Sequence, residues 1–175
     1  MRDIIYTDIQ TCIKNGIDIK DILNNIKEIM KIEYPDYIDW FNNKVIPGIY
    51  TNERNIILIY KNNNLIGFVN LKKTKKERKL SNLYIKSKIS YNKYFNDLIN
   101  LSMNWLETDE PTLIISEKEF NKCAYSILNN NWNSTNIIKK NDSIYYIFNG
   151  NDEFYYIKKS LTKKRKKDIY KKENN

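Results

Sequence analysis

The chain has 175 residues, of which 41% are hydrophobic and 29% are charged, a composition typical of one globular domain with its own core. It contains no histidine and only two cysteines, Cys12 and Cys123, which excludes histidine-based catalytic dyads and triads and the standard zinc sites. The net charge of +9 comes mostly from two short basic segments, which excludes a uniformly basic domain.

The apolar pattern of the first half predicts one strand, two helices and a hairpin, in that order. Asp21 and Asp36 each stand where a side chain can cap a helix. Pro35 interrupts the chain between the helices, and Pro47-Gly48 is expected to break it after the second. The expected elements are a strand beginning at 4–6, helices over 22–30 and 37–41, and strands over 56–60 and 65–71.

The second half alternates between strands and helices. The basic segment 72–79 is expected to form a turn, Pro111 to end a helix, and Asn141-Asp142 to form the last turn. Asn149-Gly150 is expected to close the domain. The expected elements are strands over 80–85, 113–115, 137–138 and 144–148, and helices over 94–106 and 118–130.

The order of these elements predicts the fold class. Strand, helix, strand and helix in the middle of the chain imply a partly parallel sheet, and the flanking hairpins make the sheet mixed. We therefore expect an α+β (mixed α/β) fold, with one domain over 1–157 and a basic C-terminal tail over 158–175.

Two segments carry the basic charge. The tail, 158–175, holds nine Lys or Arg against Asp168 and Glu173. The inner segment, 72–79, contains a single acidic residue, Glu77, and six basic ones: Lys72, Lys73, Lys75, Lys76, Arg78 and Lys79. Such segments attract nucleic acid, an acidic protein or an anionic membrane surface, or they only keep the chain solvated.

The composition also bears on the location of the protein. Ile, Asn and Lys, which have A/T-rich codons, make up almost half of the chain, so we expect an A/T-rich bacterial, phage, viral or organellar genome. No apolar run approaches the roughly 18 residues of a membrane-spanning helix, and no secretory signal follows Met1. We therefore expect a cytoplasmic, intracellular protein whose two cysteines are small core residues.

A series of short motifs runs in order through residues 34–150. They are Tyr34-Pro35-Asp36, Asp39-Trp40-Phe41, Lys44-Val45-Ile46-Pro47-Gly48, Glu53-Arg54-Asn55-Ile56-Ile57, Leu65-Ile66-Gly67, Leu71-Lys72-Lys73-Thr74, Thr108-Asp109-Glu110-Pro111, Leu113-Ile114-Ile115 and Phe148-Asn149-Gly150. With the order of elements, this series resembles one bacterial and phage branch of the GCN5-related N-acetyltransferase (GNAT) family. The resemblance implies a central, mostly antiparallel sheet, flanked by helices, whose two parallel strands, 80–85 and 112–116, splay apart.

The resemblance implies acetyl-CoA as cofactor, in the slot between these two strands. Backbone groups of Leu83, Tyr84 and Ile85 would pair with the pantetheine arm and polarise the thioester carbonyl. The diphosphate would lie on the segment that enters the next helix, which is formed here by Ser90, Tyr91, Asn92, Lys93, Tyr94 and Phe95. The family pattern there is Arg/Gln-x-x-Gly-x-Gly/Ala, and this sequence departs from it by placing Ser90, Lys93 and Phe95 at the three defining positions.

The resemblance also suggests where catalytic groups would lie. Many members of the family use a Tyr on the helix after the second splayed strand, and that position falls on Ile127. Tyr125 is two residues away and points about 200° from it on a helix. A carboxylate after the second strand could accept the proton of an amine. The candidates are Tyr84 and Tyr125 as acids and Glu117 or Glu119 as base.

Three interpretations remain open. The first is an active N-acetyltransferase that moves an acetyl group from acetyl-CoA to an amine of a protein or small molecule, whose identity the sequence does not indicate. The second is a catalytically inactive module that binds a protein or nucleic acid through 72–79 and 158–175. The third is an unrelated α+β structural protein. A homodimer is compatible with each of them, and segment 90–95 distinguishes the first from the second.

Overall fold

The computed structural model describes residues 4–32, 34, 36–86, 90–129, 132–140 and 143–150. Three sequence expectations lie outside these residues: the interruption at Pro35, the turn at Asn141-Asp142 and the tail 158–175. Within the described part, no helix has the length and apolar character needed to cross a membrane.

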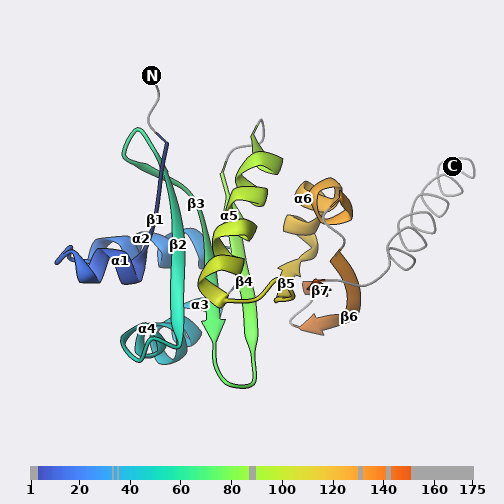
Figure 1. The fold of residues 1–175 in the computed structure, drawn as a ribbon, viewed down its shortest axis with the longest axis horizontal. Coiled ribbons are helices and arrows are strands. Elements are labelled where there is room, and N and C mark those ends of the chain that lie inside the picture. Colours follow the sequence, from blue (N-terminus) through green and yellow to red (C-terminus); the bar gives the residue numbers. More distant parts are fainter. Residues whose placement is uncertain are drawn as a thin grey trace, which may run out of the picture.

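A seven-stranded mixed sheet forms the centre of the molecule, with the strand order β1-β2-β3-β4-β5-β7-β6 (Figure 1). Among the described strands, only β4 and β5 run parallel, and every other neighbouring pair is antiparallel. The strands are β1 (Ile4–Asp8), β2 (Arg54–Lys61), β3 (Asn64–Lys73), β4 (Arg78–Ile85), β5 (Thr112–Ser116), β6 (Trp132–Lys140) and β7 (Ser143–Gly150). The expected mixed, mostly antiparallel α/β fold is confirmed.

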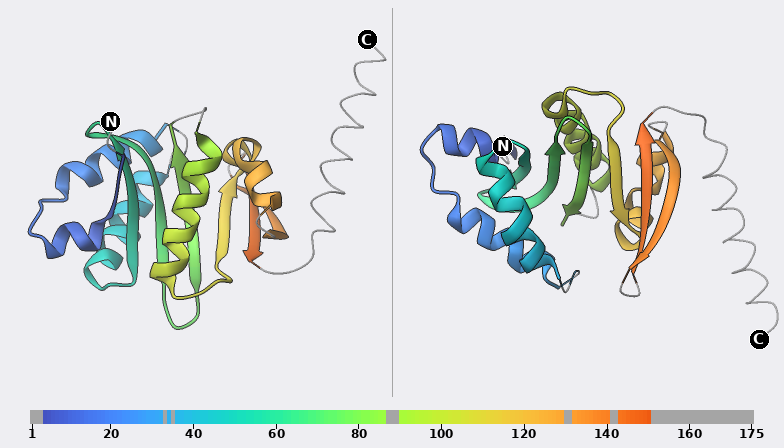
Figure 2. Two further views of the ribbon diagram at one scale, coloured as in Figure 1. Left: turned by 45° about the horizontal axis from the view of Figure 1, so that its top comes forward. Right: turned by 90° about the horizontal axis from the view of Figure 1, so that it is seen from below.

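Helices cover both faces of the sheet (Figure 2). On one face, α5 (Tyr91–Leu106) and α6 (Glu117–Asn129) bury an apolar cluster against β2 to β5 and β7. On the other face, a second cluster lies under the helices α1 (Ile9–Lys14), α2 (Lys20–Met30), α3 (Tyr37–Trp40) and α4 (Ile46–Tyr50) and the π-helical turn η1 (Phe41–Val45). Because successive side chains of a strand point to opposite faces of the sheet, the same strands contribute residues to both clusters.

The N-terminal helices differ from their prediction in two respects. A short helix, α1, follows β1 directly, and the Asp8 carboxylate caps it by accepting from the Thr11 backbone N–H. Asp21 lies inside the first turn of α2 and does not cap it. The prediction missed α1 because six residues give too short a periodic pattern to recognise.

Pro47-Gly48 does not break the chain, contrary to the prediction. α3, η1 and α4 follow one another without interruption, and Pro47 lies in the first turn of α4. Proline removes one backbone N–H from this continuous helical segment, and it follows directly on the wider turn of η1, where the Ile46 N–H bonds to the Phe41 carbonyl.

The central hairpin follows its prediction closely. Asn62 and Asn63 connect β2 and β3, and both have positive φ angles, of 50° and 61°. Asn tolerates this conformation better than most residues, and two such residues in succession match the right-handed twist of a hairpin. The basic segment contributes to β3 and β4 as well as to their turn, so both strands are longer than expected.

Both cysteines are free and buried. Cys12, on the buried side of α1, is 4% exposed, and Cys123, on the buried side of α6, has no exposed surface. The expectation that both are small core residues is confirmed.

Candidate functional site

The two parallel strands separate part of the way along their length. Their pairing consists of Lys79 with Thr112, Leu80 with Leu113 and Ser81 with Ile114. β4 then continues to Ile85 without further pairing to β5. The strands therefore part as the expected GNAT-like sheet requires, and the separation is visible in Figure 2.

A bulge in β4 marks the point of separation. On the β3 side, Phe68 pairs with Tyr84 and Asn70 pairs with Ser81, so two residues of β4 oppose the single residue of β3 between Phe68 and Asn70. Asn82, the first of the two, has a φ of 49°. A bulge bends its strand and strengthens the local twist, which explains why β4 leaves β5 here.

A cavity of about 370 Å³ opens beside the separation. Both strands contribute to its wall, and so does the segment that leads into α3. Its lining residues are Tyr34, Asp36, Tyr37, Trp40, Arg54, Lys79, Ser81, Asn82, Leu83, Ile114, Ile115, Ser116, Ile138 and Tyr145. A volume in this range can hold a small molecule.

Aromatic side chains make one wall of the cavity. The rings of Tyr34 and Tyr145 stack with their centroids 6.0 Å apart. The Tyr37 hydroxyl accepts a hydrogen bond of 3.0 Å from the Asn70 side-chain amide. Burial raises the pKa of Tyr37 well above its usual value, so this hydroxyl stays protonated at physiological pH.

The residues predicted to hold the pantetheine arm are divided between the two faces of the sheet. Leu83 lines the cavity. Tyr84 stacks on Phe68, with ring centroids 5.4 Å apart, on the face covered by the N-terminal helices. Ile85 is buried beneath α5 and α6. Cofactor binding would use their backbone edge, which lies beyond the pairing of β4 with β5.

The segment predicted as the diphosphate loop is mostly helical. α5 begins at Tyr91, three residues earlier than expected, with Ser90 before its first turn. Tyr91, Tyr94 and Phe95 point into the core. Phe95 is therefore a core residue with no exposed surface.

The polar side chains of this first turn already have partners. The Lys93 ammonium lies 2.7 Å from the Asp97 carboxylate and 3.2 Å from the Tyr6 hydroxyl of β1. The hydrogen bond with Asp97 raises the pKa of Lys93. Asn92 accepts a hydrogen bond of 2.9 Å from Ser126 of α6. In this arrangement Lys93 is directed toward β1 and Asp97.

A buried hydrogen bond joins the starts of α5 and α6. The Tyr91 hydroxyl donates to the Glu119 carboxylate over 2.6 Å, and Lys122 pairs with the same carboxylate. Tyr91 is 5% exposed and Glu119 is 1% exposed. A tyrosine therefore fills the space between the two helix starts. The separated strands leave an edge of β4 on which the thioester end of acetyl-CoA would lie, whereas its diphosphate end would meet neither a glycine-rich turn nor a cation aimed at it among the described residues.

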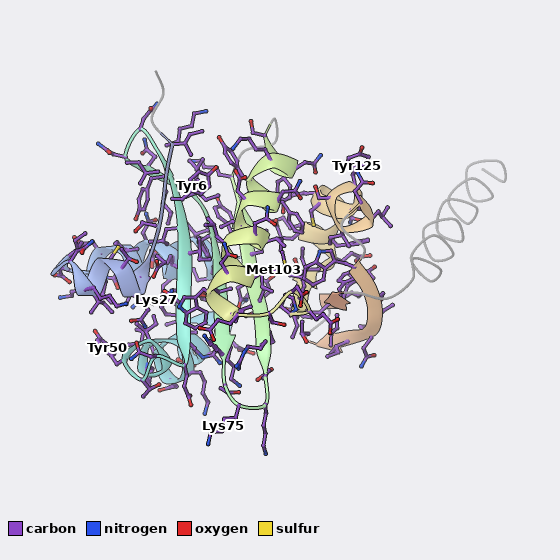
Figure 3. The ribbon with its side chains drawn as sticks, viewed as in Figure 1. Tyr6, Lys27, Tyr50, Lys75, Met103 and Tyr125 are labelled. Atoms are coloured by element: carbon purple, nitrogen blue, oxygen red, sulfur yellow. The ribbon has the colours of Figure 1, made fainter. Side chains whose placement is uncertain are left out.

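The predicted catalytic residues do not converge on one point. Tyr84 lies on the face of the N-terminal helices, and Glu117, at the start of α6, lies 3.4 Å from the Tyr146 hydroxyl. Tyr125 is 68% exposed and projects outward from α6, as Figure 3 shows. Glu119, the other candidate base, is bound to Tyr91 and Lys122.

Several residues of the cavity wall were not predicted as site residues. Trp40 and Arg54 belong to motifs that carry the family resemblance, and Tyr37 lies between two of those motifs, but nothing in their spacing indicates that they share one wall. Tyr145 reaches the cavity from β7, more than 90 residues along the chain. Only the tertiary structure brings these residues together.

The basic segment 72–79 borders a second hollow, at the start of β4. This hollow has a volume of about 510 Å³ and is lined by Gln10, Lys14, Asn52, Glu53, Lys73, Thr74, Lys75, Arg78 and Trp105. Much of the segment's charge is already paired. Glu77 binds both Lys72 and Lys79, at 2.5 and 2.6 Å, and Lys73 pairs with Glu107 at 2.7 Å. Lys75 projects from the tip of the β3–β4 turn (Figure 3).

Three solved structures share this fold at low sequence identity. A probable acetyltransferase from Staphylococcus epidermidis matches with a TM-score of 0.53 at 13% identity, over 85% of this chain and 99% of its own. A GNAT-family acetyltransferase from Bacillus cereus matches with a TM-score of 0.57 at 14% identity, over 87% and 99%. The Campylobacter jejuni N-acetyltransferase PseH, solved in complex with acetyl coenzyme A, matches with a TM-score of 0.53 at 12% identity, over 86% and 100%. No protein-family model and no curated protein matches the chain.

These similarities, together with the separated strand pair, define the architecture as the GNAT fold. The resemblance drawn from the sequence motifs is therefore confirmed at the level of the fold. At identities of 12 to 14%, the similarity carries no acceptor or partner over to this chain.

Proposed function

We propose that the protein is a GNAT-type N-acetyltransferase whose acceptor amine binds in the cavity beside β4 and β5. The observation that carries the proposal is the end of strand pairing at Ser81 and Ile114, where residues of both strands line an open cavity. The acetyl thioester of acetyl-CoA would lie along the edge of β4 from Leu83 to Ile85, beyond the end of its pairing with β5. Acetyl-CoA supplies the activated acetyl group when it is bound.

The chain itself would contribute positioning and proton transfer. A small amine held between the aromatic wall and β5 would be oriented toward the thioester carbonyl, and such orientation can supply several kcal/mol of the barrier. Backbone N–H groups on the β4 edge would stabilise the developing oxyanion. Tyr84 and Tyr125 remain the candidate acids, and Glu117 and Glu119 remain the candidate bases.

Ligand binding and acetyl transfer are tested separately. Acetyl-CoA should raise the melting temperature in a saturable way, and an amine panel should release the free thiol of CoA. Ser116→Trp, which fills the cavity from the end of β5, should abolish transfer. Asn121→Trp, an exposed position on α6, is the matched control and should leave transfer unchanged. Absence of stabilisation at millimolar acetyl-CoA would exclude this function.

Two tyrosine variants identify the acid. Tyr84→Phe and Tyr125→Phe each remove one hydroxyl and keep the ring. The acid is the residue whose variant lowers kcat at unchanged KM for acetyl-CoA. If neither variant changes kcat by more than about twofold, neither tyrosine is the general acid, because general acid catalysis typically contributes at least a hundredfold.

The buried Tyr91–Glu119 contact favours a second candidate, a catalytically inactive module. A filled space between the starts of α5 and α6 opposes the binding of a diphosphate there. Such a module would bind an acidic protein or a nucleic acid through 72–79 and 158–175. Its affinity should fall steeply with salt and should be lost on deletion of 158–175. Binding that is indifferent to both changes would exclude the module.

A further inference from the structure

Arg54, at the start of β2, is a buried cation that has no ion-pair partner among the described residues. It is 9% exposed and lines the cavity, and its Nη1 atom has no hydrogen-bond partner within the same part of the chain. None of the ion pairs found within the described residues includes it. Glu53 and Glu77 act on it only at longer range, and burial lowers the pKa of its guanidinium. Burying a charge and a donor without partners destabilises a protein, so this side chain calls for a functional explanation.

The surroundings of Arg54 hold it in place without neutralising it. Its side-chain stem lies on Gly48 of α4 so closely that a Cβ atom at Gly48 would come within 2.7 Å of the arginine Cδ. Its guanidinium carbon lies 5.4 Å from the centre of the Trp40 ring. The glycine of the Pro47-Gly48 pair therefore provides room for an arginine. A guanidinium oriented by packing and by an aromatic ring keeps its donors available for a ligand.

The charges of the cavity wall indicate what that ligand carries. The described charged lining residues are Arg54, Lys79 and Asp36. Lys79 is already paired with Glu77 at 2.6 Å, which leaves Arg54 as the lining cation without a carboxylate partner. The remaining lining is aromatic or aliphatic, apart from Ser81, Asn82 and Ser116. An anionic group on a small, partly apolar molecule matches this arrangement.

We propose that the acceptor bound in this cavity is an amine that also carries a carboxylate or a phosphate, and that Arg54 binds that anionic group. The identification of the ligand as an acetyl acceptor rests on the proposed function, whereas the preference for an anion rests on Arg54 alone. A polyamine fits poorly, because its charges would meet a buried cation. Both anions accept charge-assisted hydrogen bonds from a guanidinium, so the two are distinguished by experiment.

Binding is measured by calorimetry on the full chain without acetyl-CoA, so that the result does not depend on catalysis. The probes form matched pairs: phenylalanine with phenethylamine, and phosphoethanolamine with ethanolamine, with spermidine as a polycation. We expect the anionic member of one pair to bind at least tenfold more tightly than its partner. The pair that shows the difference identifies carboxylate or phosphate as the anion recognised.

Arg54→Met tests the role of the arginine, because it removes the charge and keeps a stem that packs on Gly48. This variant should lose the tenfold preference, whereas Lys61→Met, which removes a cation at the other end of β2, should keep it. If Arg54 serves binding and not folding, Arg54→Met should also melt at or above the wild-type temperature, since it removes an unpartnered buried donor.

Several results would overturn the proposal. They are equal binding of the two members of each matched pair, with and without the anionic group, an unchanged preference in Arg54→Met, a substantially lower melting temperature of that variant, or no binding of any probe at about 10 mM. Anion binding without stabilisation by acetyl-CoA would reject the transferase function and keep the anion site. Stabilisation by acetyl-CoA without anion preference would reject the anion site and keep the transferase function.

Discussion

The hydrogen bond between Tyr91 and Glu119 should be one of the strongest single polar contacts in the molecule. Tyr91→Phe removes a 2.6 Å hydrogen bond to a carboxylate that is 1% exposed. Hydrogen bonds to buried charged groups contribute about 1.5–3 kcal/mol. Because Lys122 still pairs with the carboxylate, we expect a loss of about 2 kcal/mol from the free energy of unfolding.

Urea unfolding measures this loss directly. With a slope of about 2 kcal/mol/M for a chain of this size, the midpoint of Tyr91→Phe should fall by about 1 M. Glu119→Gln should cost a similar amount, and the double variant should cost about 1 kcal/mol less than the sum of the two, because both single changes break the same contact. Tyr50→Phe, at a tyrosine that is 67% exposed, is the matched control and should not shift the midpoint.

The same contact should make the stability of the protein depend on pH in the alkaline range. Burial raises the pKa of Tyr91 far above the usual 10.0, so its contribution to stability is complete below pH 10 and decreases as the pH rises further, because only the unfolded chain ionises there. Wild-type protein should therefore lose stability above pH 10 more steeply than Tyr91→Phe. A change of less than about 0.5 kcal/mol in Tyr91→Phe, or costs that simply add in the double variant, would refute the reasoning.

Three further predictions concern other parts of the chain. Hydrogen bonds from Lys72 and Lys79 lower the pKa of Glu77 from 4.5 to about 2, so its stabilisation is complete above pH 4.5 and is lost as the pH falls toward 2. Urea unfolding at a series of pH values measures this loss of unfolding free energy. Glu77→Gln should reduce the loss by no more than about 1 kcal/mol, since the side chain is 34% exposed. Burial raises the pKa of the Cys123 thiol, so a disulfide reagent such as DTNB should leave it unmodified in native protein and react with it in urea; rapid native reaction would contradict its placement. Asn82→Val should lower stability by about 1–2 kcal/mol because of the positive φ angle, whereas Asn82→Gly should be tolerated; equal effects in thermal melts would show that the bulge does not need this conformation.

Local patterns predicted the sheet better than the helix starts. The hairpin of β2 and β3 was predictable because two apolar runs flank asparagines, and those asparagines adopt the positive φ angles that a tight turn needs. The start of α5 was placed three residues late, because Ser90 makes no side-chain capping hydrogen bond. Its first turn is stabilised through the burial of Tyr91 and Tyr94 against the rest of the fold, which the local sequence does not reveal.

The cavity was predictable only in outline. The family resemblance located the separation of the two parallel strands, and the pairing confirms it. Arg54 could not be recognised in the sequence, because its burial depends on Gly48 and Trp40, and because an arginine at the start of a strand is ordinarily exposed. The same holds for Tyr145, which reaches the cavity only through the return of β7 beside β5.

The wide turn η1 gives the N-terminal helical segment an unusual spacing. Tyr37, Phe41, Val45 and Ile49 are all at most 3% exposed and recur every four residues. In a regular α-helix, three such steps would rotate the last side chain by about 120° from the first; the looser winding of a π-helical turn takes up this rotation. The continuous helical segment of α3, η1 and α4 therefore contributes Tyr37 and Trp40 to the cavity wall near its beginning, and holds Gly48, on which Arg54 packs, near its end. A tilt of this segment would change the width of the cavity and the position of its cation together.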